Sequence, residues 1–261
     1  MSPKPTLILV PGAWHNGAII FNKVISVLSK QQYKCIPIAL PSITPTGDPS
    51  ITYIDDITAV RNVIEAETTQ GRDVVLVVHS YGGHVGSSAM RGLTRPKQQQ
   101  NPNRDASGHG HVIGFAMISS VFTVTGASFV DGTGKHPPWM TENLETGFIE
   151  ITVPARDVFY HDLPEDEGNE WAAKLQRMSA RTGKEGGEHA YAGWKDVPVW
   201  YLATKDDHAL PYEIQMMFVK MAKEAGGDIT VREIESSHSP MLSRPEETAE
   251  FVSDAVNAFV G

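Results

Sequence analysis

The sequence of 261 residues predicts an α/β fold with about six mostly parallel strands and helices on both faces of the sheet. Short apolar runs typical of fully buried strands alternate with segments whose apolar residues recur at helical spacing. This alternation stops between residues 121 and 196 and then resumes. We therefore expect a core formed by residues 1–120 and 197–261, with an inserted and mainly helical cap at 121–196.

The expected strands are apolar runs bounded by turn residues. The run at 73–78 has the strongest strand pattern, and the run at 6–10 ends at a Pro-Gly pair. Pro37 lies within a third run and predicts an edge or bulged position, because proline cannot donate to a sheet ladder. This third run is residues 35–40, and the remaining runs are residues 111–120, 197–203 and 228–234.

The segments that follow these strands show helical spacing of apolar residues or a favourable first turn of a helix. In the last of them Pro245 stands near the start and is followed by two glutamates, which suits the helix dipole. The expected helices are residues 17–31, 52–69, 82–93, 165–180, 212–225 and 244–260. The polar stretch 95–110 has almost no residues to bury and is predicted to be a mobile surface loop.

Composition and charge exclude several classes of partner. The net charge is −9 and no Lys/Arg cluster is present, which argues against nucleic acid and anionic membranes. No apolar run approaches the ~20 residues of a membrane span, and the N-terminal run is too short for a signal peptide. Cys35 is the only cysteine, so no internal disulfide can form, and a cytoplasmic location is expected. No histidine–carboxylate set with metal-ligand spacing is recognised, so no metal site is expected.

Ser80 is the candidate nucleophile. In the stretch "VVLVVHSYGG" it follows a buried strand directly, and Gly82 and Gly83 give the room that a sharp strand-to-helix turn needs. The usual pattern is G-x-S-x-G, and Val78 replaces its first glycine. Val78 therefore predicts a slightly strained or widened turn. The alternative is that Ser80 only caps the helix that follows.

A serine nucleophile needs a base and a group that orients the base. His238, in "ESSHSP", follows the last strand, although four further histidines also lie near strand ends: His15, His79, His84 and His208. The acid should stand between Ser80 and His238 in the chain. Asp207 is selected over Asp206 because a proline follows it four residues later.

An acyl-transfer site also needs two N–H groups aimed at the developing oxyanion. Tyr81, the residue after the candidate nucleophile, would supply one of them. Ala13, in the loop "PGAWHNG" after the first strand, would supply the other. Four segments of the predicted site thus stand at the carboxyl ends of strands, where open parallel sheets bind ligands.

The stretches "VPGAWHNG", "VVHSYGG", "VFYHDLPEDEGNEWAAKL", "VPVWYLATKDDHALP" and "HSPML" together resemble the α/β-hydrolases. The resemblance covers essentially the whole chain and is greatest to the compact branch of plant methyl-ester esterases, hydroxynitrile lyases and related bacterial and fungal esterases. It implies that Ser80 is the nucleophile, His238 the base and Asp207 the orienting acid, with oxyanion donors at Ala13 and Tyr81. It also implies that no cofactor is needed.

The same resemblance makes residues 121–196 a cap over Ser80. We expect Trp139 and Phe159 from the cap, with Trp14 and His15 from the oxyanion loop, to line an apolar substrate pocket. The alternative is that these aromatic residues only hold the cap together.

The expected function is hydrolysis of a small, fairly apolar carboxylic ester or lactone through an acyl-enzyme. One alternative is a lyase or a cyclase/isomerase that uses His238 as a general base. A third hypothesis is a ligand receptor on a hydrolase scaffold. No nucleic acid or membrane partner is expected, and a homodimer is compatible with the sequence.

Overall fold

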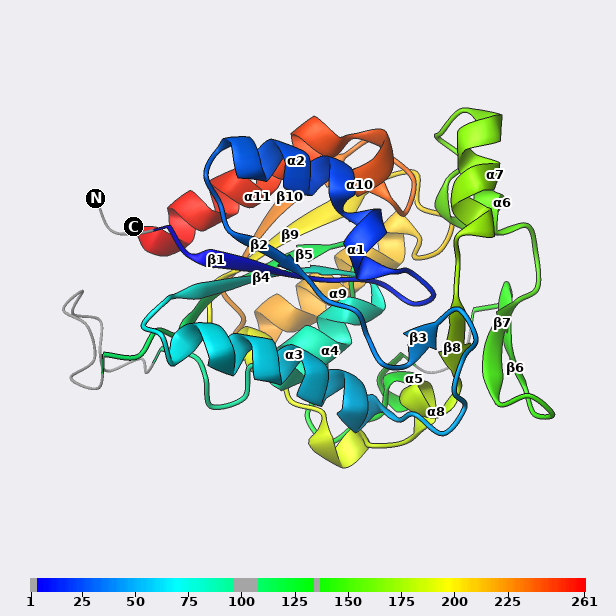
Figure 1. Ribbon diagram of the computed structural model, residues 1–261, viewed down its shortest axis with the longest axis horizontal. Coiled ribbons are helices and arrows are strands. Elements are labelled where there is room, and N and C mark those ends of the chain that lie inside the picture. Colours follow the sequence, from blue (N-terminus) through cyan, green and yellow to red (C-terminus); the bar gives the residue numbers. More distant parts are fainter. Residues whose placement is uncertain (1–3, 96–107, 134–136) are drawn as a thin grey trace.

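A computed structural model describes residues 4–95, 108–133 and 137–261, and its centre is a sheet of six parallel strands (Figure 1). In their order across the sheet the strands are β10 (Ile229–Ile234), β9 (Val199–Thr204), β5 (Val112–Ile118), β4 (Val74–His79), β1 (Thr6–Val10) and β2 (Cys35–Pro37). Every neighbouring pair is parallel. The predicted fold class is confirmed, and Pro37 lies on an edge strand as expected.

Helices cover both faces of this sheet, which explains why the central strands are almost entirely apolar (Figure 1). Helices α2 (Asn22–Lys30) and α11 (Pro245–Val260) pack together on one face, and α3 (Tyr53–Thr68), α4 (Tyr81–Ala89) and α9 (Tyr212–Glu224) lie on the other. The short helix α10 (Pro240–Ser243) precedes α11. All residues of β1, β4 and β5 are buried.

Three predicted helices are shorter than expected, and in one of them α4 ends at Ala89 rather than at residue 93. The segment 17–31 forms α1 (Gly17–Ile20) and then α2, separated by Phe21 at φ −95° and ψ 1°. The segment 165–180 forms helix α7 (Glu165–Ala173) and then strand β8 (Arg177–Ser179). Met178 in this strand pairs with Ile43 and Ile149, so pairing with distant segments overrides the local helical pattern.

The segment 121–196, called the cap segment here, contains a small sheet that the sequence pattern did not indicate. Its order is β3-β8-β7-β6 and its pairs are antiparallel. Strands β6 (Met140–Asn143) and β7 (Phe148–Ile151) belong to the cap segment, and β3 (Ile43–Thr44) comes from the core. The other elements are α5 (Phe129–Thr133), α6 (Ala155–Phe159), α7, α8 (Arg181–Lys184), η1 (Gly187–His189) and η2 (Gly193–Lys195).

The elements β6, β7, α6 and α7 lie to one side of the core, beyond the ends of its strands (Figure 1, right). The predicted surface loop at 95–110 falls mostly outside the described residues. Cys35 on β2 is partly buried, and burial raises the pKa of its thiol to about 11, as expected of an unreactive cysteine. In the described part of the chain, none of the helices has both the length and the apolar composition that a membrane crossing requires.

Candidate active site

Ser80 occupies a sharp turn between β4 and α4. Its backbone has φ 50° and ψ −122°, a conformation that costs a non-glycine residue about 1–3 kcal/mol. Glycines make this turn possible: a Cβ on Gly82 would lie 2.5 Å from the carbonyl oxygen of Val10, and one on Gly12 would lie 3.0 Å from Cβ of Ser80. The strained turn therefore holds Ser80 against the loop that follows β1.

Val78 is accommodated by a glycine on the helix that follows. A Cβ on Gly86 would lie 2.9 Å from Cγ1 of Val78 and 3.4 Å from Phe115. Val78 is fully buried. At this contact between β4 and α4, the strand carries the valine side chain and the helix carries only a glycine. The crowding expected from Val78 is thereby relieved at a position six residues beyond Ser80.

This packing gives a stability prediction. Gly86→Ala should destabilise the fold by about 1–3 kcal/mol, although alanine in place of glycine ordinarily favours a helix by about 1 kcal/mol. In the double variant with Val78→Ala, the added methyl group has room, so the combined loss should be smaller than the sum of the single losses by at least about 0.5 kcal/mol. Urea unfolding of the four proteins measures this coupling, and additive losses would contradict the packing argument.

His238 and Asp207 are joined by a buried hydrogen bond. Nδ1–H of His238 donates to Oδ2 of Asp207 at 2.8 Å, and both side chains are at most 3% exposed. Thr204 also donates to Oδ2, while the N–H groups of Ala209 and Leu210 donate to Oδ1. The carboxylate is therefore fixed from several sides, and it fixes the ring of His238 with Nε2 available for a proton.

The other candidates from the sequence lie elsewhere. Asp206, the alternative acid, is exposed, and its Oδ2 lies 3.1 Å from Nε2 of His161 rather than near His238. His84 stacks on Tyr53 with ring centroids 4.4 Å apart. His208 donates from Nδ1 to the carbonyl oxygen of Asp157. Asp206, His84 and His208 thus have other partners, whereas the ring of His238 is hydrogen-bonded to Asp207.

Two buried histidines support the site, and the sequence pattern did not assign them this role. His79 donates from Nε2 to the backbone carbonyl of His238 at 2.8 Å, which ties the turn at Ser80 to the loop of the candidate base. Nδ1–H of His15 donates to the carbonyl of Ala13, and Nε2 of His15 accepts from the hydroxyl of Tyr160. Burial lowers the pKa of His15 to about 4 and that of His79 well below its usual range, so both rings are neutral at pH 7.

Tyr81, one of the two predicted oxyanion donors, follows Ser80 directly. Tyr81 is the first residue of α4, where backbone N–H groups have no acceptor within the helix. The hydroxyl of Tyr81 donates to Asp56, a carboxylate with no exposed surface that also accepts from the N–H and hydroxyl of Ser42. Burial raises the pKa of Asp56 to about 6, although these hydrogen bonds oppose the shift. Asp56 thus anchors the side chain of Tyr81, the residue that follows Ser80.

The raised pKa of Asp56 predicts a specific dependence of stability on pH. The folded chain binds this proton more tightly than the unfolded chain, whose carboxyl has a pKa near 3.8. The contribution of Asp56 to stability is therefore complete below pH ~4 and is lost as the pH rises through 6. Relative to Asp56→Asn, the wild type should lose up to about 3 kcal/mol of unfolding free energy between pH 4 and 7. Urea titrations at both pH values measure the difference, and parallel pH profiles would contradict it.

Ser80, Tyr81, Ala13 and His238 lie on the wall of one cavity of about 240 Å³. All four residues expected to bind substrate, Trp14, His15, Trp139 and Phe159, line the same cavity. The three larger aromatic rings contact one another, with centroids 5.4–6.0 Å apart. The other lining residues are Val121, Phe129, Pro137, Met140, Ile149, Met178, Thr182, Gly183, Ala209, Leu210, Pro211, Ile214 and Phe218.

Comparison with known proteins gives a consistent result. The family model described as "Alpha/beta hydrolase family" matches residues 7–251. The chain is 30% identical over 256 residues to the alpha/beta hydrolase nvfD of Aspergillus novofumigatus, covering 97% of this chain and 96% of that protein. It is 25% identical over 267 residues to a pyrethroid hydrolase of Sphingobium wenxiniae, covering 97% of this chain and 88% of the relative.

Among solved structures, tomato methylketone synthase I in complex with 2-tridecanone superposes with a TM-score of 0.76 at 15% identity, covering 98% of this chain and 99% of that one. At this identity the likeness concerns the fold alone. The family model and the sequence relatives span nearly the whole chain. The chain therefore belongs to the alpha/beta hydrolase family.

Proposed function

We propose that the protein is a serine hydrolase that cleaves a small, fairly apolar carboxylic ester or lactone. The observation that carries the proposal is the shared cavity: Ser80 on its strained turn and His238, held by Asp207, both line it. The family membership and the relatives named as hydrolases support the same reaction class.

In the proposed mechanism, Nε2 of His238 takes the proton of Ser80 as Oγ attacks the substrate carbonyl. The N–H groups of Ala13 and Tyr81 donate to the oxyanion of the tetrahedral intermediate. The protonated His238 then gives its proton to the leaving alcohol, and an acyl-enzyme remains on Ser80. Water, deprotonated by His238, attacks this acyl group and releases the acid.

The cavity supports a small and apolar acyl group. Its volume of about 240 Å³ lies below the ~300–1,000 Å³ that is usual for pockets of drug-sized ligands. Apart from the indole N–H of Trp139, the cap segment contributes one polar side chain to the described wall, that of Thr182, and its hydroxyl donates to the carbonyl of Ser179. Burial of apolar surface, rather than recognition of a charged group, would therefore provide most of the binding energy.

The same wall favours hydrolysis over the alternatives with a lyase or a cyclase/isomerase mechanism. Such chemistry would be favoured by a basic or polar residue that faces Ser80 from the cap, and the described lining residues of the cap segment provide no basic side chain and only the Thr182 hydroxyl and the Trp139 indole N–H. An acyl adduct on Ser80, trapped with a slow ester and located by mass spectrometry, would support the hydrolase. Tight binding of a small ligand without turnover of any ester would support the receptor.

A panel of p-nitrophenyl esters and lactones tests the proposal. We expect turnover of short and medium acyl chains in the wild type and none above background in Ser80→Ala. Trp139→Ala removes a ring that contacts Trp14 and Phe159, so kcat/KM for hexanoate should fall by about 10-fold or more. The loss for acetate should be smaller, because a two-carbon acyl group makes fewer contacts with the cap. Equal losses for both esters would contradict the assignment of Trp139 to the acyl pocket.

A further inference from the structure

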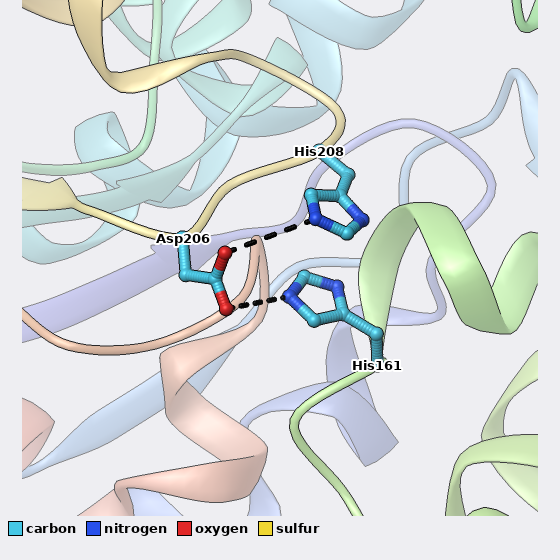
Figure 2. Close-up of side chains that lie close together, drawn as sticks. All are labelled: His161, Asp206 and His208. Atoms are coloured by element: carbon cyan, nitrogen blue, oxygen red, sulfur yellow. Dashed lines mark hydrogen bonds and ion pairs between the residues drawn. The ribbon is translucent and has the colours of Figure 1, made fainter.

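A second group of reactive side chains lies outside the cavity, where the cap segment meets the core. Figure 2 shows the carboxylate of Asp206 facing the rings of His161 and His208. Oδ2 of Asp206 is 3.1 Å from Nε2 of His161, and Oδ1 is 3.8 Å from Nε2 of His208. His161 follows α6 of the cap segment, whereas Asp206 and His208 lie in the turn between β9 and α9. Neither histidine lines the cavity at Ser80.

We propose that His161, Asp206 and His208 bind a divalent transition-metal ion, with Zn²⁺ as the best match. One ligand atom from each residue can be chosen so that all three lie within 4.8 Å of one another. A tetrahedral Zn²⁺ with bonds of about 2.0–2.1 Å separates its ligand atoms by ~3.3–3.4 Å. The separations from Asp206 to the two histidines, 3.1 Å from Oδ2 and 3.8 Å from Oδ1, bracket that value. Three protein ligands leave the fourth position for water.

Hydrogen bonding prepares one of the rings for this role. Nδ1–H of His208 donates to the backbone carbonyl of Asp157 at 2.7 Å, so the lone pair of the neutral ring is on Nε2, which faces Asp206. A ligating histidine almost always donates its other N–H to a carbonyl or carboxylate in this way. Two imidazoles with one carboxylate favour Zn²⁺ or Co²⁺ over Mg²⁺ and Ca²⁺, which prefer sites made entirely of oxygen.

Binding requires the two rings to turn out of their parallel stack. They stack at present, with centroids 3.7 Å apart and planes at 12°, whereas the two Nε2 lone pairs must converge on one ion. The side chain of His208 is 53% exposed and that of Asp206 is 65% exposed, so both can turn. Nε2 of His161 donates its proton to Asp206 at present, so ligation through Nε2 moves the ring proton to Nδ1, which has no hydrogen-bond partner among the described residues.

The three proposed ligands lie close in the chain to residues of the candidate active site. Asp206 and His208 stand on either side of Asp207, and His161 is two residues from Phe159 on the cavity wall. Next to this site, Asp162 of the cap segment accepts from the N–H of Ser237, which precedes His238. A bound ion would therefore join the cap segment to the core beside the candidate base and acid.

Calorimetric titration with ZnCl₂ after chelator treatment tests the proposal directly. Wild type should bind one equivalent with an affinity that falls by about 10–100-fold in His208→Ala and in His161→Ala. His189→Ala is the matched control, because His189 is also a partly exposed histidine beside a carboxylate, that of Glu188, and is not part of the cluster. CoCl₂ should give visible ligand-field absorption in the wild type and in His189→Ala only. MgCl₂ should give no heat at the same concentration.

Two outcomes would overturn the proposal. One is the absence of Zn²⁺ binding to the wild type, in which case the three side chains are only a hydrogen-bonded contact between cap segment and core. The other is unchanged affinity in both cluster variants, which would place the ion elsewhere. If His161→Ala does not fold, the affinity of His208→Ala alone tests the site. The side chain of His208 is 53% exposed, against 16% for His161, so its removal should disturb the fold less.

Discussion

Ser80→Ala is expected to lower kcat for a p-nitrophenyl ester by at least about 10⁴-fold and to abolish labelling by a fluorophosphonate probe. The turn between β4 and α4 puts Ser80 on the cavity wall with His238, and no other serine lines that wall among the described residues. Without Oγ no acyl-enzyme can form, so the remaining rate reflects only binding and the oxyanion donors. Initial rates and intact-protein mass measure the two effects.

Ser87→Ala is the matched control for this substitution. Ser87 is also buried on α4, but its hydroxyl donates to the carbonyl of Tyr191, away from the cavity. It should retain both turnover and labelling, with a loss of stability near 1 kcal/mol for the missing hydrogen bond. Undiminished labelling of Ser80→Ala would show that Ser80 is not the nucleophile, whatever the turnover.

The parts of the fold that the sequence predicts well are those with strong local patterns. Strands β1 and β4 are continuous apolar runs bounded by turns, and their order in the chain follows from alternation with amphipathic helices. The predicted site residues also stand at strand ends, which a parallel sheet brings to one edge. Local pattern and topology therefore suffice to bring Ser80, Asp207 and His238 close to one another in the fold.

Features that depend on contacts between residues far apart in the sequence could not be predicted in this way. The strand β8 pairs with β3 and β7, and its own sequence continues a helical pattern. His161 and Asp206 are 45 residues apart and belong to different parts of the fold, so no spacing rule connects them. Val78 is similar: it breaks a short motif, and only its contact with Gly86 shows how the turn is kept.

Asp207→Asn is expected to lower kcat by about 10³–10⁴-fold, because an amide cannot satisfy the donors around this side chain. Oδ2 accepts from His238 and Thr204, and Oδ1 accepts from two backbone N–H groups. Whichever way the amide turns, its NH₂ faces a donor. If it faces His238, the ring must carry its proton on Nε2, where it cannot accept from Ser80. The loss should appear in kcat for every ester, since ground-state binding of the acyl group is unaffected.

Asp206→Asn separates this effect from a general loss of negative charge in the turn. Its carboxylate reaches His161 instead of His238, so in chelator-treated protein the substitution should cost less than about 10-fold in kcat. The two variants differ by one position in the chain and carry the same change of charge. A large loss in Asp206→Asn together with a small one in Asp207→Asn would assign the acid to Asp206, against the hydrogen bond between Asp207 and His238. The buried hydrogen bond between Asp207 and His238 requires the opposite result, which is a large loss of kcat in Asp207→Asn and a small one in Asp206→Asn.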